Sequence, residues 1–345
     1  MDFSNLDVDE QAMGMSGGFC EGLASFYYKG KWGFVNNLGN VIIAPDYDLV
    51  MFFKEGLCAV MSKEGLVDAW GFVDKTGRLV IEPSFTSVGY FVNGLCPISV
   101  RGAFNRGSGS GRNDSYGYCD KHGDIKIDLK FEYAGTFKNG MALVKRQGSF
   151  GFINVEGSQR IDFKYESASG FYDELAAVKL KGKWGYIDQY DRMVIEPQFD
   201  EVGNFSYGLA GVKINDKWAI IDKTGQKLVF DKYLSFYDFT PEGALVETEK
   251  GFSFINNQGN LLFDKYFQDA LSFSEGLAAV KIEDLWGYIN AKGESILKPE
   301  FQLAEQFAEG IASVNKDGQY CFINHQGGIM KIKMPNIPET TLEYE

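Results

Sequence analysis

The sequence predicts an all-β fold made of nine tandem repeats, each a three-stranded meander of about 34 residues. An aromatic residue, usually followed by glycine, recurs along the chain, and six of its eight successive spacings are 34 residues; the other two are 38 and 46. Four positions after each of these aromatic residues stands an Asp or an Asn. Such a regular period is typical of repeat proteins, in which neighbouring repeats bury each other's faces. The aromatic positions are Trp32, Trp70, Tyr116, Phe150, Trp184, Trp218, Phe252, Trp286 and Tyr320.

The first two strands of each repeat carry the aromatic and small residues. The first strand has the form Gly-Leu-Ala-x-Val, as in residues 276–280, and apolar or small residues on both faces predict that it is covered on both sides. A tight turn leads to the second strand, in which Trp184 and Tyr186 share one face. Gly185 between them has no Cβ, so a ring or a backbone segment can pack closely against it.

The rest of each repeat is a turn, a third strand and a return segment. The turn has the form Asp/Asn-x-x-Gly, as in residues 74–77, where Asp bonds its own backbone and Gly takes the left-handed conformation. The return has apolar groups at every third residue, which predicts a short 3₁₀ turn or an extended segment. It ends in a phenylalanine that we expect to be a core wedge in every repeat. These residues are Phe19, Phe53, Phe91, Phe137, Phe171, Phe205, Phe239, Phe273 and Phe307.

We predict that the repeats stack into an open β-superhelix, or solenoid. The first repeat begins at its first strand and the last ends at its third, so no repeat is divided between the two ends of the array. A closed propeller-like ring is the alternative, although propeller blades have four strands and repeats of about 40 or more residues. The chain divides into an N-terminal arm (1–18), the array (19–333, with an insertion loop at 101–114) and a C-terminal tail (334–345).

Composition excludes several kinds of partner. The formal net charge is −13, which disfavours nucleic acid and anionic membrane surfaces, because both require clustered Lys and Arg. No apolar run approaches the ~20 residues of a membrane span. The N-terminus has no basic flank followed by an apolar segment, so we expect a cytoplasmic protein, with signal-less export left open. The five cysteines are interpreted as structural thiols in a reducing compartment.

The sequence contains no recognisable catalytic, cofactor or metal motif, so we expect no enzyme. The two histidines, His122 and His325, each stand in the Asp/Asn-x-x-Gly turn of a different repeat and have no zinc-ligand spacing. Most carboxylates open turns or precede glycine, which makes them elements of the fold. Two alternatives to a protein-interaction scaffold remain. One is a glycan or cell-wall polymer module in which the aromatic series forms a sugar-stacking ladder rather than a core. The other, ranked last, is an enzyme with a cryptic pair of carboxylates.

The insertion loop 101–114 departs from the repeat. It contains three arginines and a phenylalanine among Gly and Ser residues, in an otherwise acidic chain. A tolerated surface loop is one interpretation. The functional interpretation is a docking loop for an acidic or aromatic site on a protein partner. The candidate partner-binding residues are Arg101, Phe104, Arg106 and Arg112.

Several features recur together at one spacing: the phrase Lys-Trp-Gly-Tyr-Ile-Asp at 183–188, the glycine of the turn, the run Val-Ile-x-Pro-x-Phe and the start Glu-Gly-Leu-Ala. Over roughly residues 19–333 this pattern resembles the bacterial WG repeat (KWG-type) family. Repeats that lack the tryptophan, and the one with Trp218-Ala219, depart from it and put uniform repeat geometry in doubt. The resemblance implies a β-rich scaffold that acts with other proteins and carries no catalytic residues. The leading expectation is therefore a non-enzymatic protein-interaction scaffold whose partner is unidentified.

Overall fold

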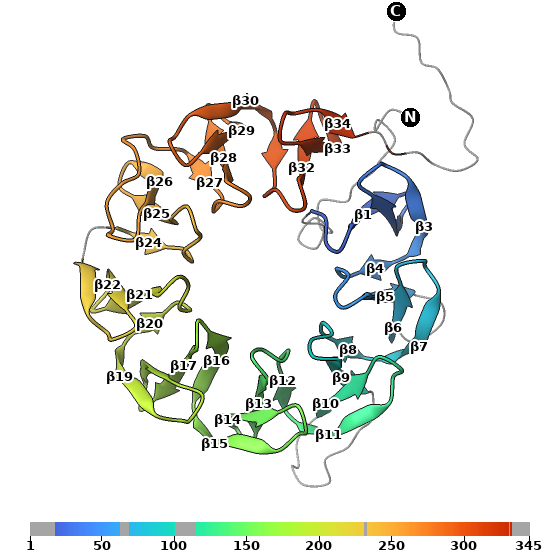
Figure 1. The fold of residues 1–345 in the computed structure, drawn as a ribbon, viewed down its shortest axis with the longest axis vertical. Coiled ribbons are helices and arrows are strands. Elements are labelled where there is room, and N and C mark those ends of the chain that lie inside the picture. Colours follow the sequence, from blue (N-terminus) through green and yellow to red (C-terminus); the bar gives the residue numbers. More distant parts are fainter. Residues whose placement is uncertain (1–17, 63–68, 101–114, 231–232, 331, 333–345) are drawn as a thin grey trace, which may run out of the picture. The chain divides into compact units, whose positions relative to one another are not determined.

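The computed structural model describes residues 18–62, 69–100, 115–230, 233–330 and 332, in which every regular element is a β-strand (Figure 1). The strands form nine small antiparallel sheets, seven with four strands and two with three. The sheets nearest the N-terminus comprise β1 (Leu23–Tyr28), β2 (Lys31–Asn36) and β3 (Val41–Tyr47), then β4 (Leu49–Val50), β5 (Leu57–Ser62), β6 (Ala69–Asp74) and β7 (Leu79–Phe85). The all-β prediction is confirmed.

The remaining sheets repeat the same strand order. The next three comprise β8 (Ser87–Val88), β9 (Leu95–Val100), β10 (Ser115–Asp120) and β11 (Ile125–Phe131); β12 (Tyr133–Ala134), β13 (Met141–Arg146), β14 (Ser149–Asn154) and β15 (Gln159–Tyr165); and β16 (Ser167–Tyr172), β17 (Leu175–Leu180), β18 (Lys183–Ile187) and β19 (Met193–Phe199). The last four comprise β20 (Glu201–Val202), β21 (Leu209–Ile214), β22 (Lys217–Asp222) and β23 (Lys227–Phe230); β24 (Ser235–Phe236), β25 (Ala244–Thr248) and β26 (Gly251–Ile255); β27 (Asp269–Ala270), β28 (Leu277–Ile282), β29 (Leu285–Asn290) and β30 (Ser295–Phe301); and β31 (Leu303–Ala304), β32 (Ile311–Lys316), β33 (Gln319–Asn324) and β34 (Ile329–Met330).

Contacts between residues divide the chain into two compact units. The first contains Met1–Pro83, Leu277–Asn290 and Glu294–Glu345, and therefore combines both ends of the sequence. The second contains Ser84–Gly276 and Ala291–Gly293. Within the second unit the third strands β15 and β19 lie at one edge of their sheets, and β12 and β16 lie at the opposite edges (Figure 1).

The fourth strand of each four-stranded sheet comes from the return segment, which the sequence predicted as a 3₁₀ turn or an extended connection. In β12, Ala134 pairs with Val144 of β13, and in β20, Val202 pairs with Val212 of β21. The prediction of three strands per repeat is thus one strand short in most sheets. Two-residue strands are too short to show an alternating pattern, so the sequence did not reveal them. With this strand included, the repeats match the four-stranded blades of a β-propeller.

The prediction of an open superhelix is wrong, because the first and last repeats are joined within the first unit. The backbone N–H of Gly22 donates a 2.7 Å hydrogen bond to Glu309 Oε2, 287 residues away. The same bond links consecutive repeats, from the Gly56 N–H to Glu21 Oε2 at 2.9 Å. The rings of Phe19 and Phe322 also meet with their centroids 5.7 Å apart. The last repeat therefore contacts the first as the first contacts the second, which fits the closed alternative.

Turn chemistry agrees with the sequence. In the turn after β18, Asp188 Oδ1 accepts hydrogen bonds from the N–H groups of Tyr190 and Arg192 at 2.9 and 3.0 Å. The fourth position is left-handed even where it is not glycine, since Asp191 has a φ of 63°. The hairpin between β17 and β18 has two residues of positive φ, Lys181 and Gly182, as in a type I′ turn.

The glycine that follows the other four tryptophans, but not Trp218, is required by a bulge in the third strand. Trp184 pairs with Phe199 but Tyr186 pairs with Ile195, so the opposite strand contains two extra residues around Pro197. A Cβ added to Gly185 would lie 2.8 Å from the Pro197 nitrogen. In the repeat with Ala219, the pairing with β23 at that point is regular and the bulge is absent. The doubt about uniform repeat geometry is confirmed at this repeat.

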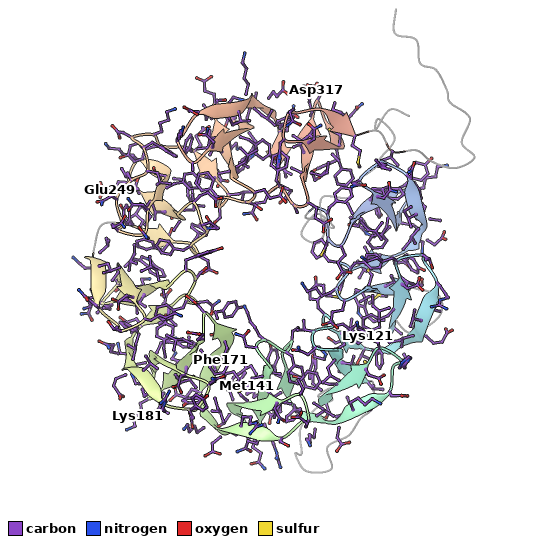
Figure 2. The ribbon with its side chains drawn as sticks, viewed as in Figure 1. Lys121, Met141, Phe171, Lys181, Glu249 and Asp317 are labelled. Carbon is purple, nitrogen blue, oxygen red and sulfur yellow. The ribbon has the colours of Figure 1, made fainter. Side chains whose placement is uncertain are left out.

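The core lies between consecutive sheets. Leu175, Tyr186 and Phe199 of one sheet form a single buried cluster with Phe205 and Val212 of the next. All nine return phenylalanines are buried, which confirms their role as core wedges. Figure 2 shows the side chains that fill the spaces between sheets of the second unit, among them Phe171, whereas Lys181 points into solvent from its turn.

The aromatic residue before glycine is less buried than the core interpretation requires. Among the five tryptophans Trp32 is buried and the other four are half-buried. The ring two positions later takes the interior place instead; Tyr186 is 1% exposed, and its hydroxyl donates to the Gly203 carbonyl oxygen at 2.8 Å. The interpretation of the aromatic series as a core therefore holds only in part for Trp184, because Tyr186 on the same strand face contacts the next sheet.

A carboxylate that accepts hydrogen bonds from the next repeat predicts that the stability of the fold depends on pH. Asp173 accepts hydrogen bonds from the Gly208 N–H (2.6 Å) and Lys223 Nζ (3.0 Å). Burial alone would raise the pKa of Asp173, but these two hydrogen bonds outweigh it and lower the pKa. A carboxyl whose pKa is lower in the folded state than in the unfolded state, where it is about 4, stabilises the fold at pH values above that unfolded-state pKa. This stabilisation is lost as the pH falls through the folded-state pKa. Asp173→Asn should therefore lower the denaturation midpoint at neutral pH and have little effect near pH 2.

Guanidinium unfolding at both pH values measures this difference, and Asp216→Asn, in an exposed turn, is the matched control. If Asp173→Asn lowered the denaturation midpoint equally at both pH values, the charge of Asp173 would not be the cause of the lost stability.

Candidate functional site

The predicted docking residues Arg101, Phe104, Arg106 and Arg112 lie outside the described residues. The structure does place the two ends of their loop. Val100 at the end of β9 pairs with Ser115 at the start of β10, in the second unit. In the next sheet, Arg146 and Ser149 pair in the same way around a two-residue turn. The insertion therefore replaces a tight hairpin turn and leaves its two strands in register.

A group of aromatic and basic side chains lies beside the base of the insertion loop. Tyr116, next to Ser115, has its ring centroid 6.5 Å from that of Tyr133, which in turn lies 6.2 Å from that of Phe150. Lys145 Nζ lies 5.3 Å from the Phe150 centroid. Tyr133 is exposed, and Tyr116 and Phe150 are half-buried. We call Tyr116, Tyr133, Lys145, Arg146 and Phe150 the loop-stem patch.

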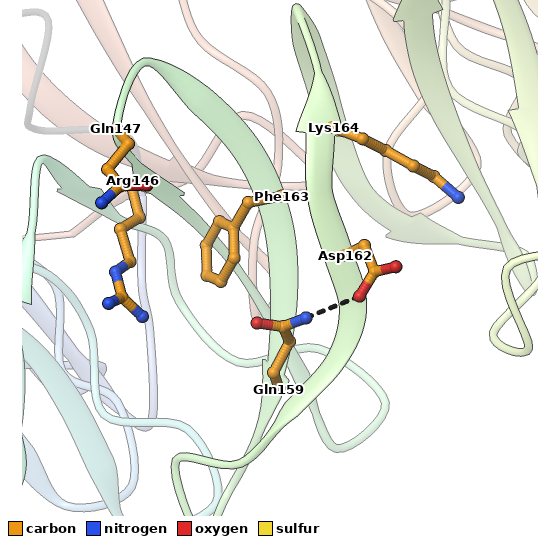
Figure 3. Close-up of a pocket in the computed structure, with 6 residues that line it drawn as sticks. All are labelled: Arg146, Gln147, Gln159, Asp162, Phe163 and Lys164. Atoms are coloured by element: carbon orange, nitrogen blue, oxygen red, sulfur yellow. Dashed lines mark hydrogen bonds between the residues drawn. The ribbon is translucent and has the colours of Figure 1, made fainter.

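Arg146 extends the patch into a shallow pocket of about 510 Å³ (Figure 3). The Phe163 ring lies within this pocket, and Gln159 Nε2 donates a 2.7 Å hydrogen bond to Asp162 Oδ1. Arg146 is exposed and has no ion pair within the described part of the chain. Its guanidinium is therefore available to a carboxylate from outside, which it can bind with two parallel hydrogen bonds.

Charge is distributed unevenly along the sequence. Residues 101–164, which include the insertion loop and the patch, contain 11 Lys or Arg and seven Asp or Glu, whereas the whole chain contains 34 and 47. This segment is thus net basic in an acidic protein. Guanidinium and aromatic groups are enriched at protein interfaces and among the residues that contribute most to binding. The sequence analysis missed Tyr133 and Arg146, although alignment of the repeats shows both departing from the residues at equivalent positions, such as Ser167 and Leu180.

The turn carboxylates are used within the fold. Hydrogen bonds, chiefly from the Thr76 hydroxyl, lower the pKa of Asp74 to about 2. His122 is exposed in its turn, and the His325 ring lies 4.4 Å from that of Phe307. Among the described residues, no three His, Cys, Asp or Glu side chains gather as metal ligands would. The described residues also contain no helix long and apolar enough to cross a membrane.

Lysine side chains lie over one ring face of two tryptophans in the aromatic ladder. Lysine ammonium groups lie 5.9 Å from the ring centroids of both Trp184 and Trp218, in cation–π contact. Trp184 also packs, as a half-buried residue, against the buried cluster that joins its sheet to the next. A continuous stacking surface would require these ring faces to be free.

Comparison with known proteins agrees with the repeat structure. The family described as the WG containing repeat matches seven segments, which cover more than half of the chain: 32–66, 70–102, 116–148, 150–184, 184–218, 252–286 and 286–320. No curated protein matches the sequence.

Among solved structures, a eukaryotic initiation factor is similar with a TM-score of 0.55 at 11% identity, over 80% of this chain and 84% of that one. Hsv2 from Kluyvelomyces marxianus has a TM-score of 0.37 at 9% identity, over 54% and 69% of the two chains. PorZ of Porphyromonas gingivalis has a TM-score of 0.31 at 10% identity, over 87% and 44%. The first of these likenesses concerns the fold alone.

Proposed function

The chain belongs to the WG-repeat family and is a repeat scaffold for binding, and from this premise we propose that it is a non-enzymatic scaffold that binds a protein partner through the loop-stem patch and the insertion loop. The partner presents acidic side chains to Arg146 and to the arginines of the loop. The five cysteines form no disulfide, which fits a reducing compartment, and we place the protein in the cytoplasm.

The loop-stem patch is the observation that supports this proposal. Its rings form a continuous series from the base of the loop to the next sheet, with centroid separations of 6.5 and 6.2 Å. Rigid strands hold these rings, so little side-chain entropy is lost when a partner binds. The repeated carboxylates, in contrast, are consumed by turns and by bonds between repeats, which leaves little support for a catalytic pair.

Replacement of the insertion tests the proposal. Because Val100 and Ser115 pair as Arg146 and Ser149 do, residues 101–114 can be replaced by a two-residue Asn-Gly turn. We expect the melting temperature to stay within a few degrees of the parent, since the loop replaces a turn, and partner recovery to fall. Affinity purification from native lysate with quantitative mass spectrometry measures recovery, and thermal unfolding of the same samples checks the fold.

A paired substitution provides the matched control. Tyr133→Ser with Arg146→Ser removes an aromatic and a guanidinium from the patch, whereas Tyr190→Ser with Arg192→Ser removes the same groups from another exposed turn. The first pair should reduce recovery of the partner and the second should not. Equal recovery of the partner by the parent, the loop replacement and the patch variant would support the interpretation of the insertion as a tolerated surface loop.

A further inference from the structure

At one junction between repeats a small first-strand residue faces a large short-strand residue. Gly211 of β21 occupies the position of Ala177 and Ala279 in other first strands. Opposite it, Phe236 of β24 stands where Val202 and Ala270 occupy the short strand. The first-strand position varies among the repeats, as Leu143 and Ser313 show, but among the described short strands only β24 has an aromatic residue at its second position.

A pocket of about 240 Å³ lies at this junction, between the sheets of β21 and β24 in the second unit. Trp218, Phe236 and Tyr237 provide aromatic walls, and the rings of Trp218 and Phe236 meet at 62° with centroids 6.2 Å apart. Gly211 forms part of the floor, where an added Cβ would lie 3.1 Å from Phe236 Cβ and 3.6 Å from Trp218 Cζ3. The missing side chain at Gly211 therefore lets Phe236 and Trp218 pack close to the backbone of β21.

Two polar side chains, Asn204 and Asp238, also line the pocket. Asn204 is half-buried and Asp238 exposed, and neither side chain forms a hydrogen bond within the part of the chain that the structure describes. Burial raises the pKa of Asp238, and the charge of Lys138 opposes this only in part. An amide and a carboxyl that form no hydrogen bond with the described residues, set beside aromatic rings, can orient a ligand that carries hydroxyl groups.

The charges around the pocket are balanced. Lys138 acts on Asp238, and Lys213, whose Nζ lies 5.9 Å from the Trp218 centroid, pairs with Glu201 at 3.0 Å. A cationic ligand would meet two lysines, and an anionic ligand would meet Asp238. The balance therefore favours a neutral ligand. The volume is below the range of about 300–1,000 Å³ that is usual for drug-sized ligands, so the pocket suits one ring rather than a chain.

We propose that this pocket binds a single pyranose unit of a neutral saccharide, with its C–H face against Trp218 and Phe236 and its hydroxyls bonded to Asn204 and Asp238. The site is separate from the loop-stem patch, and the inference does not depend on the proposed protein partner. It also differs from the aromatic ladder, because it requires the rings of one junction only.

Saturation-transfer NMR on the full chain tests this proposal with methyl β-glucopyranoside, methyl β-galactopyranoside and N-acetylglucosamine at millimolar concentrations, which suit weak binding. We expect saturation of the ring C–H protons for at least one of these sugars. Asp238→Ala and Asn204→Ala remove exposed or half-exposed groups without disturbing the core, and each should weaken binding about tenfold or more. Asp216→Ala, in an exposed turn, is the control that should bind as the parent does.

Linear oligomers of the bound sugar distinguish a free monosaccharide from a chain end. Saturation confined to the terminal unit of the oligomer assigns the pocket to a glycan end, and binding of the methyl glycoside alone assigns it to a free sugar. Absence of transfer to all three sugars, equal transfer in the parent and both pocket variants, or saturation by tetramethylammonium instead would overturn the proposal. Thermal unfolding of every variant confirms that the fold is retained.

Discussion

Replacing Phe205 with alanine should lower the free energy of unfolding by about 3–5 kcal/mol, the usual cost of removing a buried phenylalanine ring. Phe205 is 1% exposed, and its ring centroid lies 4.7 Å from that of Tyr186 in the preceding sheet. It belongs to the cluster that joins two sheets, so the cavity would open at the interface that holds the repeats together. Guanidinium unfolding of the full chain measures the change.

Two controls separate the interior position from aromatic character. Trp184→Ala should cost less than Phe205→Ala, because Trp184 is only half-buried. Tyr190→Ala should cost less than about 0.5 kcal/mol, since the side chain is 70% exposed. Hydrogen exchange should show the loss from Phe205→Ala mainly in its own and the preceding sheet, as contacts in repeat proteins join nearest neighbours. A Phe205→Ala variant as stable as Tyr190→Ala would show that the return phenylalanine is not a wedge.

The second large effect is expected from Gly185→Ala, at about 2–3 kcal/mol, in the range for overpacking of a filled site. The added Cβ would overlap the carbonyl oxygen of Ile195 and lie 2.8 Å from the nitrogen of Pro197, and both are backbone atoms that cannot rotate away. The bulge in β19 must shift to admit it. Chemical unfolding compared with the parent measures the cost.

The chain provides its own control for this substitution. Ala219 occupies the equivalent position in a repeat without the bulge, so Ala219→Gly should cost no more than about 1 kcal/mol, the entropic difference between the two residues in a strand. If Gly185→Ala unfolds at the parent's midpoint, the close approach of the bulged strand does not explain the glycine.

Much of the repeat could be predicted from the sequence, because its determinants act over a few residues. Asp188 bonds backbone groups two and four positions ahead, and Lys181 and Gly182 adopt the conformations that a two-residue hairpin demands. The sequence also predicted the buried phenylalanines from their period. It assigned too much burial to Trp184, because two residues on the same strand face compete for the interior and only the neighbouring sheet decides between them.

The candidate sites, too, could be predicted from the sequence only in part. The insertion at 101–114 was evident as a break in the period, and its arginines were evident as basic residues in an acidic chain. Tyr133 and Arg146 became candidates only when the structure placed them beside the base of that loop. The pocket at Gly211 needed the structure too, since its walls come from strands of two sheets.

By itself, therefore, the sequence determined the strand types, the turns, the nine-fold repeat and the family to which the chain belongs. Tertiary structure decided the fourth strand, the burial of each ring and the joining of the array's ends. Whether those ends meet depends on the small rotation between one sheet and the next, added over all the repeats, and no single repeat encodes that sum. The hydrogen bond from Gly22 to Glu309 spans 287 positions for this reason, although it has the same chemistry as the bond from Gly56 to Glu21.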